Sequence, residues 1–302
     1  MSKVPDISAP QSAGVPFDIA QSPALGGAAH GFFGSAGGAH QFGYGGPGDP
    51  DAITALRAAA AQAIATGAQI FTPHQTHSCD VITLASGGDA GWHNGWGDAP
   101  GGRPVGDALV TNRPGCAVGI VTADCGPILF ADNDRGVIGA AHAGWRGAQG
   151  GVIENTLAAM EALGARRGHI TAVLGPTIAQ ASYEVDAAFR AHFTRDDDRH
   201  FAAAPMREGR ARWHFDLPGY ILARLEACGV GCARALGHDT YSHARVGPKD
   251  GAKDRAKDGA KDGAKNDDDD GAEHAVRYYS YRRASHNGAP NYGRQLSAIA
   301  LV

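Results

Sequence analysis

The segment from Asp107 to Ala143, DALVTNRPGCAVGIVTADCGPILFADNDRGVIGAAHA, has the clearest strand pattern of the chain. It contains four short runs of apolar and β-branched residues, which are Asp107–Thr111, Ala117–Thr122, Pro127–Ala131 and Val137–Ala141. Turn residues separate these runs. Apolar runs of about four to eight residues bounded by turns are typical of buried strands. We therefore predict that this segment forms the central strands of a sheet structure.

Further elements flank this segment on both sides. Short runs of β-branched or aromatic residues predict strands at Gln69–Phe71, Val81–Leu84, Thr171–Leu174, Tyr278–Tyr281 and Gln295–Leu301. Helical spacing of apolar residues predicts helices from Ala52, capped by Asp51, to about Thr66, from Val152 to about Leu163, and from Pro218 to Ala227. The alternation of strands and helices predicts an α/β fold.

Composition and charge exclude several classes of protein. The chain has 302 residues, 43% of them hydrophobic, so it can bury a large core, and we expect one domain because no linker divides its motifs. The net charge is -4 and the isoelectric point about 6.4, so no overall positive field exists to hold nucleic acid or an anionic membrane. The sequence has no run of about 18 apolar residues and no signal-peptide pattern, which predicts a cytoplasmic protein.

Two segments have compositions that do not support a packed core. We assign residues 1–21 to a flexible N-terminal tail and residues 22–302 to the domain. Within the domain, residues at about 246–274 are near repeats of Lys-Asp-Gly-Ala that end in Asp267–Asp270, which predicts a disordered insertion in a surface loop. An acidic metal-binding loop is the alternative for this insertion.

Three other segments place metal-ligand side chains at the ends of predicted strands. They are His74-Gln-Thr-His77-Ser, Thr122-Ala-Asp-Cys125-Gly-Pro and Ala140-Ala-His142-Ala-Gly-Trp-Arg146-Gly. One thiolate and two imidazoles form a set that zinc prefers, and three protein ligands leave a fourth position open. The five cysteines have no CxxC spacing, so a metal site must be assembled from distant segments. Spacing alone is also compatible with a buried structural cysteine and two core histidines.

These three segments resemble the signature of the laccase-domain, or multicopper polyphenol oxidase-like, family, whose members are regarded as purine nucleoside phosphorylases. The family motifs are close to Gln-x-His, Thr-Ala-Asp-Cys-x-Pro and Ala-His-Ala-Gly-Trp-Arg-Gly, and all three are present. The resemblance implies a layered sandwich of mixed β-sheets flanked by helices. It also implies that His77, Cys125 and His142 bind zinc, with His74 as a competitor for the first position.

Two positions depart from the family pattern. Gly31-Phe-Phe-Gly-Ser35-Ala-Gly-Gly38 has Ser35 where the family has an arginine that helps hold an anion, and Gly175-Pro-Thr177-Ile has Thr177 where the family has a cysteine. Because Ser35 lacks the positive charge of that arginine, the first departure puts the use of phosphate as a substrate in question.

The resemblance implies phosphorolysis of adenosine, inosine and S-methyl-5′-thioadenosine, accompanied by deamination of adenosine. Zinc would activate the water that deamination needs, and Cys125, His142 and Asp124 are the candidate catalytic residues. Strand alternation would turn Asp124 away from Cys125, which instead predicts a structural role for it. Arg146 and Gln75 are the candidate substrate-binding residues, because a guanidinium fork suits phosphate or ribose oxygens. A surface arginine paired with a carboxylate is the alternative for Arg146.

A second basic group follows the insertion in the sequence. This group consists of Arg282, Arg283, His286 and Arg294. We predict that it either closes one wall of the site or neutralises nearby carboxylates, and that it has no catalytic role.

Three other functions use the same residues. A copper-dependent polyphenol oxidase would need a histidine-rich multinuclear cluster, or a weak axial ligand such as methionine, and none of the three methionines lies near the motifs. A non-catalytic zinc-binding partner protein would bind metal without turning over nucleosides. A cysteine hydrolase would use Cys125 as the nucleophile and His142 as the base, and metal content separates it from the zinc enzyme.

Overall fold

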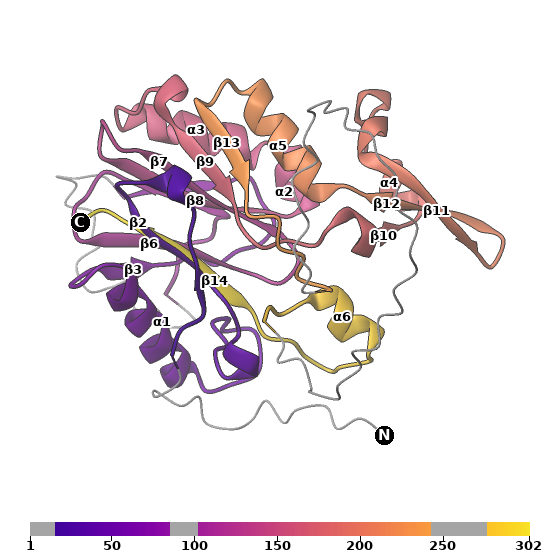
Figure 1. Ribbon diagram of the computed structural model, residues 1–302, viewed down its shortest axis with the longest axis horizontal. Helices are drawn as coiled ribbons and strands as arrows, with labels where there is room; N and C mark the ends of the chain where they lie inside the picture. Colours follow the sequence, from indigo (N-terminus) through magenta and orange to yellow (C-terminus); the bar gives the residue numbers. More distant parts are fainter. Residues whose placement is uncertain (1–15, 85–101, 243–276) are drawn as a thin grey trace, which may run out of the picture.

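Two mixed β-sheets pack face to face and carry helices on their outer faces (Figure 1). The computed structural model describes residues 16–84, 102–242 and 277–302. The predicted insertion at about 246–274 and residues 1–15 of the predicted tail lie outside these described residues. The layered α/β sandwich that the resemblance implied is confirmed.

The first large sheet has the strand order β1-β2-β14-β6-β3. Its strands are β1 (Ile19–Ala20), β2 (Ala29–Phe33), β14 (Gln295–Ala300), β6 (Cys116–Thr122) and β3 (Gln69–Phe71). Strand β3 pairs in parallel with β6, and the other neighbours are antiparallel. The last strand of the chain therefore lies in the middle of this sheet.

The second large sheet has the order β13-β9-β7-β8-β5-β4. Its strands are β13 (Cys232–Ala235), β9 (Thr171–Leu174), β7 (Gly126–Asp132), β8 (Val137–Ala143), β5 (Ala108–Thr111) and β4 (Val81–Leu84). The pairs β13–β9 and β4–β5 are parallel, and the three pairs between them are antiparallel. A third, small antiparallel sheet extends to the right in Figure 1 and contains β10 (Glu184–Val185), β12 (Arg210–Phe215) and β11 (Phe201–Arg207).

Helices cover both outer faces of the sandwich. Helix α1 (Pro50–Ile64) packs on the first sheet, and α3 (Val152–Ala162) and α5 (Leu217–Ala227) pack on the second. The shorter helices are α2 (Trp145–Gly150), α4 (Ala187–Arg190) and α6 (Tyr281–His286). Short 3-10 helices occur at Pro23–Leu25, Ala36–Gly38, Arg167–His169, Gln180–Ser182 and Arg195–His200. None of the helices in the described part of the chain has the length and apolar composition needed to cross a membrane.

The strand alternation of period two builds three apolar layers. In β6, Val118 and Ile120 pack between the two sheets, whereas Ala117 faces α1. In β5, Leu109 packs between the sheets and Val110 packs against the helices of the other face. Because both faces of these central strands are buried, their sequences are continuously apolar rather than alternating.

Three local predictions are corrected by the structure. The predicted strand at Tyr278–Tyr281 is wrong, because Ser280 caps α6 and its side chain accepts a hydrogen bond of 3.0 Å from the backbone N–H of Arg283. Local capping by a serine side chain competes here with strand propensity. The residue that caps α1 is Asp49, whose carboxylate accepts from the N–H of Ala52, and not Asp51.

The third correction concerns the predicted tail. Residues 19 and 20 are not part of a free tail, because they form β1 and pair with β2.

Candidate active site

The three predicted metal ligands meet where the chain crosses between the two large sheets. His77 lies in the loop that leads from β3 in the first sheet to β4 in the second. Cys125 lies in the turn from β6 in the first sheet to β7 in the second. His142 is near the end of β8 and pairs with Pro127 of β7. Two crossings at one end of the sandwich thus assemble a site from distant segments.

The side chains of these residues form a compact cluster. The Sγ atom of Cys125 lies 3.8 Å from Nε2 of His77, and one ligand atom from each of the three residues lies within 4.8 Å of the others. The centroids of the His77 and His142 rings are 4.8 Å apart. His74, the competing ligand, stands outside this cluster and lines the adjacent pocket.

The donor set and spacing of the cluster fit zinc. A tetrahedral ion with a Zn–S bond of about 2.3 Å and Zn–N bonds of about 2.0–2.1 Å holds sulfur and nitrogen about 3.6 Å apart. The distance of 3.8 Å between Cys125 and His77 is close to this value. Because Nδ1 of His142 is hydrogen-bonded to Asp107, its Nε2 is the nitrogen available to a metal.

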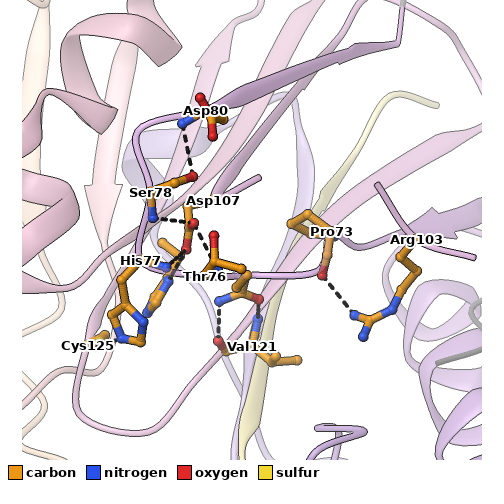
Figure 2. A network of polar contacts seen from close by, with 11 residues as sticks. Pro73, Thr76, His77, Ser78, Asp80, Arg103, Asp107, Val121 and Cys125 are labelled. Atoms are coloured by element: carbon orange, nitrogen blue, oxygen red, sulfur yellow. Dashed lines mark hydrogen bonds and ion pairs between the residues drawn. The ribbon is translucent and has the colours of Figure 1, made fainter. Parts of the chain in front are cut away.

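Asp107 organises two of the three cluster residues (Figure 2). Its carboxylate is fully buried and accepts hydrogen bonds from the backbone N–H groups of Thr76 at 3.0 Å, His77 at 3.0 Å and Ser78 at 2.6 Å. The same carboxylate lies 2.7 Å from Nδ1 of His142. These contacts hold His77 with a positive φ of 62°, a conformation that is uncommon for a residue other than glycine.

Burial and these contacts shift the ionisation of the cluster. Burial opposes the charged form of Asp107, but the hydrogen bond from His142, its charge and the backbone donors hold the pKa of the carboxyl well below its usual range. Burial also opposes the thiolate of Cys125, but His142 and His77 lower the pKa of this thiol. Burial by itself would lower the pKa of His142. The neighbouring Cys125 and Asp107 outweigh this effect, so the pKa of His142 is raised. The thiolate is the form of cysteine that binds metals.

Gly144 leaves room for the cluster. A Cβ atom at this position would lie 2.9 Å from Sγ of Cys125 and 3.0 Å from Cδ2 of His77. Real side chains rarely approach so closely, so any larger residue would displace the side chains of Cys125 and His77. Steric crowding therefore explains why the His-Ala-Gly-Trp motif has glycine at position 144.

Asp124 holds the turn that carries Cys125. It is buried, with a positive φ of 80°, and is not part of a strand. Its carboxylate accepts from the hydroxyl of Thr240 and from the backbone N–H of Arg282, each at 2.6 Å, and its carbonyl accepts from the hydroxyl of Thr177 at 2.8 Å. These contacts support the structural role predicted for Asp124, with Thr177 contributing through its hydroxyl.

Gln75 fastens the loop of His77 to the first sheet. Its amide nitrogen donates to the carbonyl of Val121 at 2.7 Å, and its amide oxygen accepts from the N–H of Val121 at 2.9 Å. Gln75 also lines the pocket beside the cluster. The structure thus adds a positioning role to the substrate contact predicted for this residue.

A pocket of about 240 Å³ lies beside the cluster and is lined by His77, Cys125 and His142 themselves. Its wall also includes His74, Gln75, Thr122, Arg57, Arg103 and Arg294. Arg146 does not line this pocket; its side chain is exposed and its guanidinium carbon lies 4.7 Å from the Trp145 ring centroid. Ser35 is fully buried and also stands apart from the pocket.

No motif of the sequence predicted Asp107, Arg57 or Arg103 as residues of the site. Asp107 follows Gly106 at the start of a predicted strand, and a buried acidic residue in that position was the available signal. Arg294 was expected to close a wall, and it does line the pocket. In contrast, Arg282 donates to the carbonyl of Glu184, and His286 contacts the hydroxyl of Tyr241.

Curated relatives of the chain carry names from nucleoside metabolism. The chain is 38% identical over 203 residues to a purine nucleoside phosphorylase of Deinococcus radiodurans, a match that covers 65% of this chain and 73% of that protein. It is 33% identical over 195 residues to adenosine deaminase RL5 of an unknown prokaryotic organism, covering 62% and 71% of the two chains.

Comparison with solved structures agrees with the fold. The chain is similar to protein NMB0706 of Neisseria meningitidis with a TM-score of 0.68 and 25% identity, over 94% of this chain and 98% of that one. Residues 25–246 match the family described as multi-copper polyphenol oxidoreductase laccase. This span is most of the chain and contains all three cluster residues, so the chain belongs to that family.

Proposed function

We propose that the protein is a zinc-dependent purine nucleoside phosphorylase that acts on adenosine, inosine and S-methyl-5′-thioadenosine and also deaminates adenosine. The observation that carries this proposal is the His77, Cys125 and His142 cluster, which lines the same pocket as three arginines. The names of the relatives support both activities.

The metal would be held by Nε2 of His142, a ring nitrogen of His77 and the sulfur of Cys125. When bound, zinc supplies Lewis-acid chemistry and lowers the pKa of water. The protein contributes the orientation of the ligands, because Asp107 fixes the ring of His142 and the loop of His77.

In phosphorolysis, a phosphate oxygen forms a bond to C1′ of the ribose while the bond from C1′ to the purine nitrogen breaks. The bonding electron pair leaves with the purine, which takes up a proton. The protein must therefore hold an anion beside C1′ and stabilise the charge that develops. Arginines in the pocket serve this purpose.

In deamination, water adds at C6 of the purine and ammonia leaves, so a proton must move from the water to the leaving amine. Both carboxylate oxygens of Asp124 already accept hydrogen bonds from Thr240 and Arg282. His74 is exposed and lines the pocket, so we assign it as the proton carrier ahead of Asp124.

The competing functions are less well supported. Type-one copper sites have a weak axial ligand such as methionine. Met160 is buried against the second sheet and Met206 is exposed on the β11–β12 hairpin, and neither lines the pocket. A cysteine hydrolase would contain no metal, and a non-catalytic partner protein would contain metal but turn over no nucleoside.

The deciding experiment incubates the zinc-loaded protein with adenosine, with and without phosphate, and separates the products by chromatography. Adenine released only with phosphate establishes phosphorolysis, and inosine formed without phosphate establishes deamination. The Cys125→Ala variant should lose both activities and its zinc. No product from a folded, zinc-bound sample refutes the proposal and favours a binding protein.

A further inference from the structure

The pocket beside the metal cluster is strongly cationic. Arg57, Arg103 and Arg294 line it, and no aspartate or glutamate among the described residues does. The chain as a whole has a net charge of -4, so this concentration of positive charge is local. Three guanidinium groups in the lining of one pocket attract an anion.

The three arginines differ in how they are held. Arg57 is fully buried and donates through Nε to the carbonyl of Phe42 at 2.7 Å and through Nη1 to the hydroxyl of Thr72 at 2.8 Å. Arg57 therefore holds its part of the pocket lining in place and adds positive charge to the pocket. Arg103 donates through Nη1 to the carbonyl of Pro73 at 2.8 Å, which fixes its guanidinium at the loop that leads to His77 (Figure 2).

Arg294 has hydrogen-bonding capacity that the described part of the chain does not use. Its Nη2 donates to the hydroxyl of Tyr292 at 3.1 Å, and its guanidinium carbon lies 4.6 Å from the centroid of that ring. Its Nη1 is buried and has no hydrogen-bond partner among the described residues. A buried donor of a charged group that lacks a partner costs free energy unless a ligand satisfies it.

A second polar group in the same lining is also unsatisfied. The Oγ1 atom of Thr122 is buried and has no hydrogen-bond partner in the described part of the protein. Thr122 ends β6, three residues before the ligand Cys125. The pocket therefore offers an N–H of the Arg294 guanidinium and the hydroxyl of Thr122, a residue close in sequence to Cys125.

We propose that Arg294, Arg103 and Thr122 form an oxyanion subsite that binds inorganic phosphate beside the metal cluster. This inference rests on the proposed function, because it names the residues that hold the phosphate in phosphorolysis. Guanidinium groups match the oxygens of phosphate through paired N–H donors, and the hydroxyl of Thr122 donates one more hydrogen bond. These residues replace Arg146 as the predicted anion clamp, because Arg146 lies outside the pocket.

The glycines around Arg294 offer a test that leaves its charge intact. A Cβ atom at Gly45 would lie 3.7 Å from Nη1 of Arg294, an ordinary contact distance, and Gly45 does not have a positive φ. A valine side chain at this position would therefore fill the space beside Nη1 without removing the arginine. Gly45→Val serves as the second variant in case Arg294→Gln fails to fold.

The experiment measures phosphate binding to the zinc-loaded protein by isothermal titration calorimetry, together with KM for phosphate and for adenosine. We expect Arg294→Gln and Arg103→Gln each to weaken phosphate binding on the order of 10- to 100-fold, as expected for hydrogen bonds to a charged group. Thr122→Val and Gly45→Val should weaken it about 3- to 10-fold, since each affects one hydrogen bond. KM for adenosine and zinc content should stay unchanged.

The controls distinguish this subsite from the other places where phosphate could bind. Arg210→Gln removes the same charge from the exposed β11–β12 hairpin and should leave phosphate binding unchanged. Arg146→Gln tests the competing clamp. Titration after zinc removal shows whether phosphate binds the arginines or only the metal, and sulfate as a competitor shows whether any tetrahedral dianion is accepted.

Each outcome bears on one of the two proposals. If folded Arg294→Gln and Gly45→Val bind phosphate as the wild type does, the subsite is refuted even where phosphorolysis is found. If the wild type binds phosphate in an Arg294-dependent way but turns over no nucleoside, the subsite stands and the proposed function falls. A loss of binding in Arg146→Gln alone moves the anion site to Arg146.

Discussion

The Oδ1 atom of Asp107 lies 2.7 Å from Nδ1 of His142, and the same oxygen accepts the backbone N–H of His77 at 3.0 Å. One buried carboxylate thus orients the ring of His142 on β8 and the loop that carries His77, which are two of the three proposed metal ligands. This relationship predicts that Asp107 contributes to the proposed metal binding, although it does not itself belong to the cluster.

We expect Asp107→Asn to lower zinc affinity about 10- to 100-fold, because partners of metal-bound histidines usually contribute that much. An asparagine side chain has one acceptor oxygen and cannot serve all the donors. Competition with a coloured chelator measures the affinity. Asp216→Asn is the control, because the carboxylate of Asp216 accepts the backbone N–H of Gly219 at the start of α5 and belongs to no group of potential metal ligands in the described part of the chain. Equal zinc affinities in both variants would contradict the role of Asp107.

Removing zinc should lower the thermal stability of the protein. A ligand present at about 1,000 times its Kd stabilises the folded state by about 4 kcal/mol. Calorimetry with and without a chelator should therefore give different Tm values for the wild type. Cys125→Ala should show the same Tm in both conditions, whereas Cys228→Ala, which removes a thiol outside the cluster, should respond to zinc like the wild type. If the Tm of the wild type is the same with and without the chelator, the protein holds no resident metal that stabilises it.

Gly144→Ala should disrupt the metal cluster, because its Cβ atom would come within 3.0 Å of both Cys125 and His77. We expect a loss of zinc affinity of at least about tenfold, comparable to the loss of a supporting contact. Gly150→Ala is the control at the last residue of α2, the helix that Gly144 precedes as N-cap, since no atom lies within 4 Å of its added Cβ. That variant should be neutral or more stable by up to about 1 kcal/mol. Metal content after gel filtration distinguishes the two, and retained zinc in Gly144→Ala would show that the ligands can move apart.

His200 should make the protein sensitive to acid. Burial and the neighbouring Arg199 lower the pKa of this histidine below its usual value of about 6.5, so the folded state prefers the neutral ring. The stability that depends on this neutral ring is complete above about pH 6.5 and is lost as the pH falls through the folded-state pKa. Thermal melts from pH 7.5 to pH 5 should show a smaller loss of Tm in His200→Gln than in the wild type. Parallel curves would contradict this assignment.

Replacing residues 246–274 with a short Gly-Ser linker should leave zinc binding and nucleoside turnover intact. The described residues on either side are held by Arg283, which donates to the carbonyls of Thr240 at 2.8 Å, Tyr241 at 2.6 Å and Tyr278 at 2.5 Å. Loop closure depends only weakly on length, so the shorter connection should cost little stability. Zinc content, product formation and Tm check this. A shortened chain that folds but loses activity would show that the segment contributes to the site.

Sequence patterns predicted most of the elements that bury apolar side chains. The strands at Gln69–Phe71, Val81–Leu84 and Thr171–Leu174 have the predicted bounds, and α3 and α5 differ from prediction by one residue. These elements depend on local composition and periodicity. Capping was less predictable, because Asp49 and Ser280 act through a single side-chain hydrogen bond that apolar spacing does not reveal.

The motifs by themselves determined which side chains could bind a metal: the thiol of Cys125 and the rings of His77 and His142 have that chemistry in any fold. Tertiary structure alone decided what surrounds them. The crossings between the two sheets bring Asp107 to the rings of His77 and His142, gather Arg103 and Arg294 in one pocket and place Arg146 outside it. Arg103 and Arg294 are nearly two hundred residues apart, and no local pattern encodes their meeting. The two arginines meet because both faces of the two sheets are buried, and this packing fixes the positions of the loops that connect the strands.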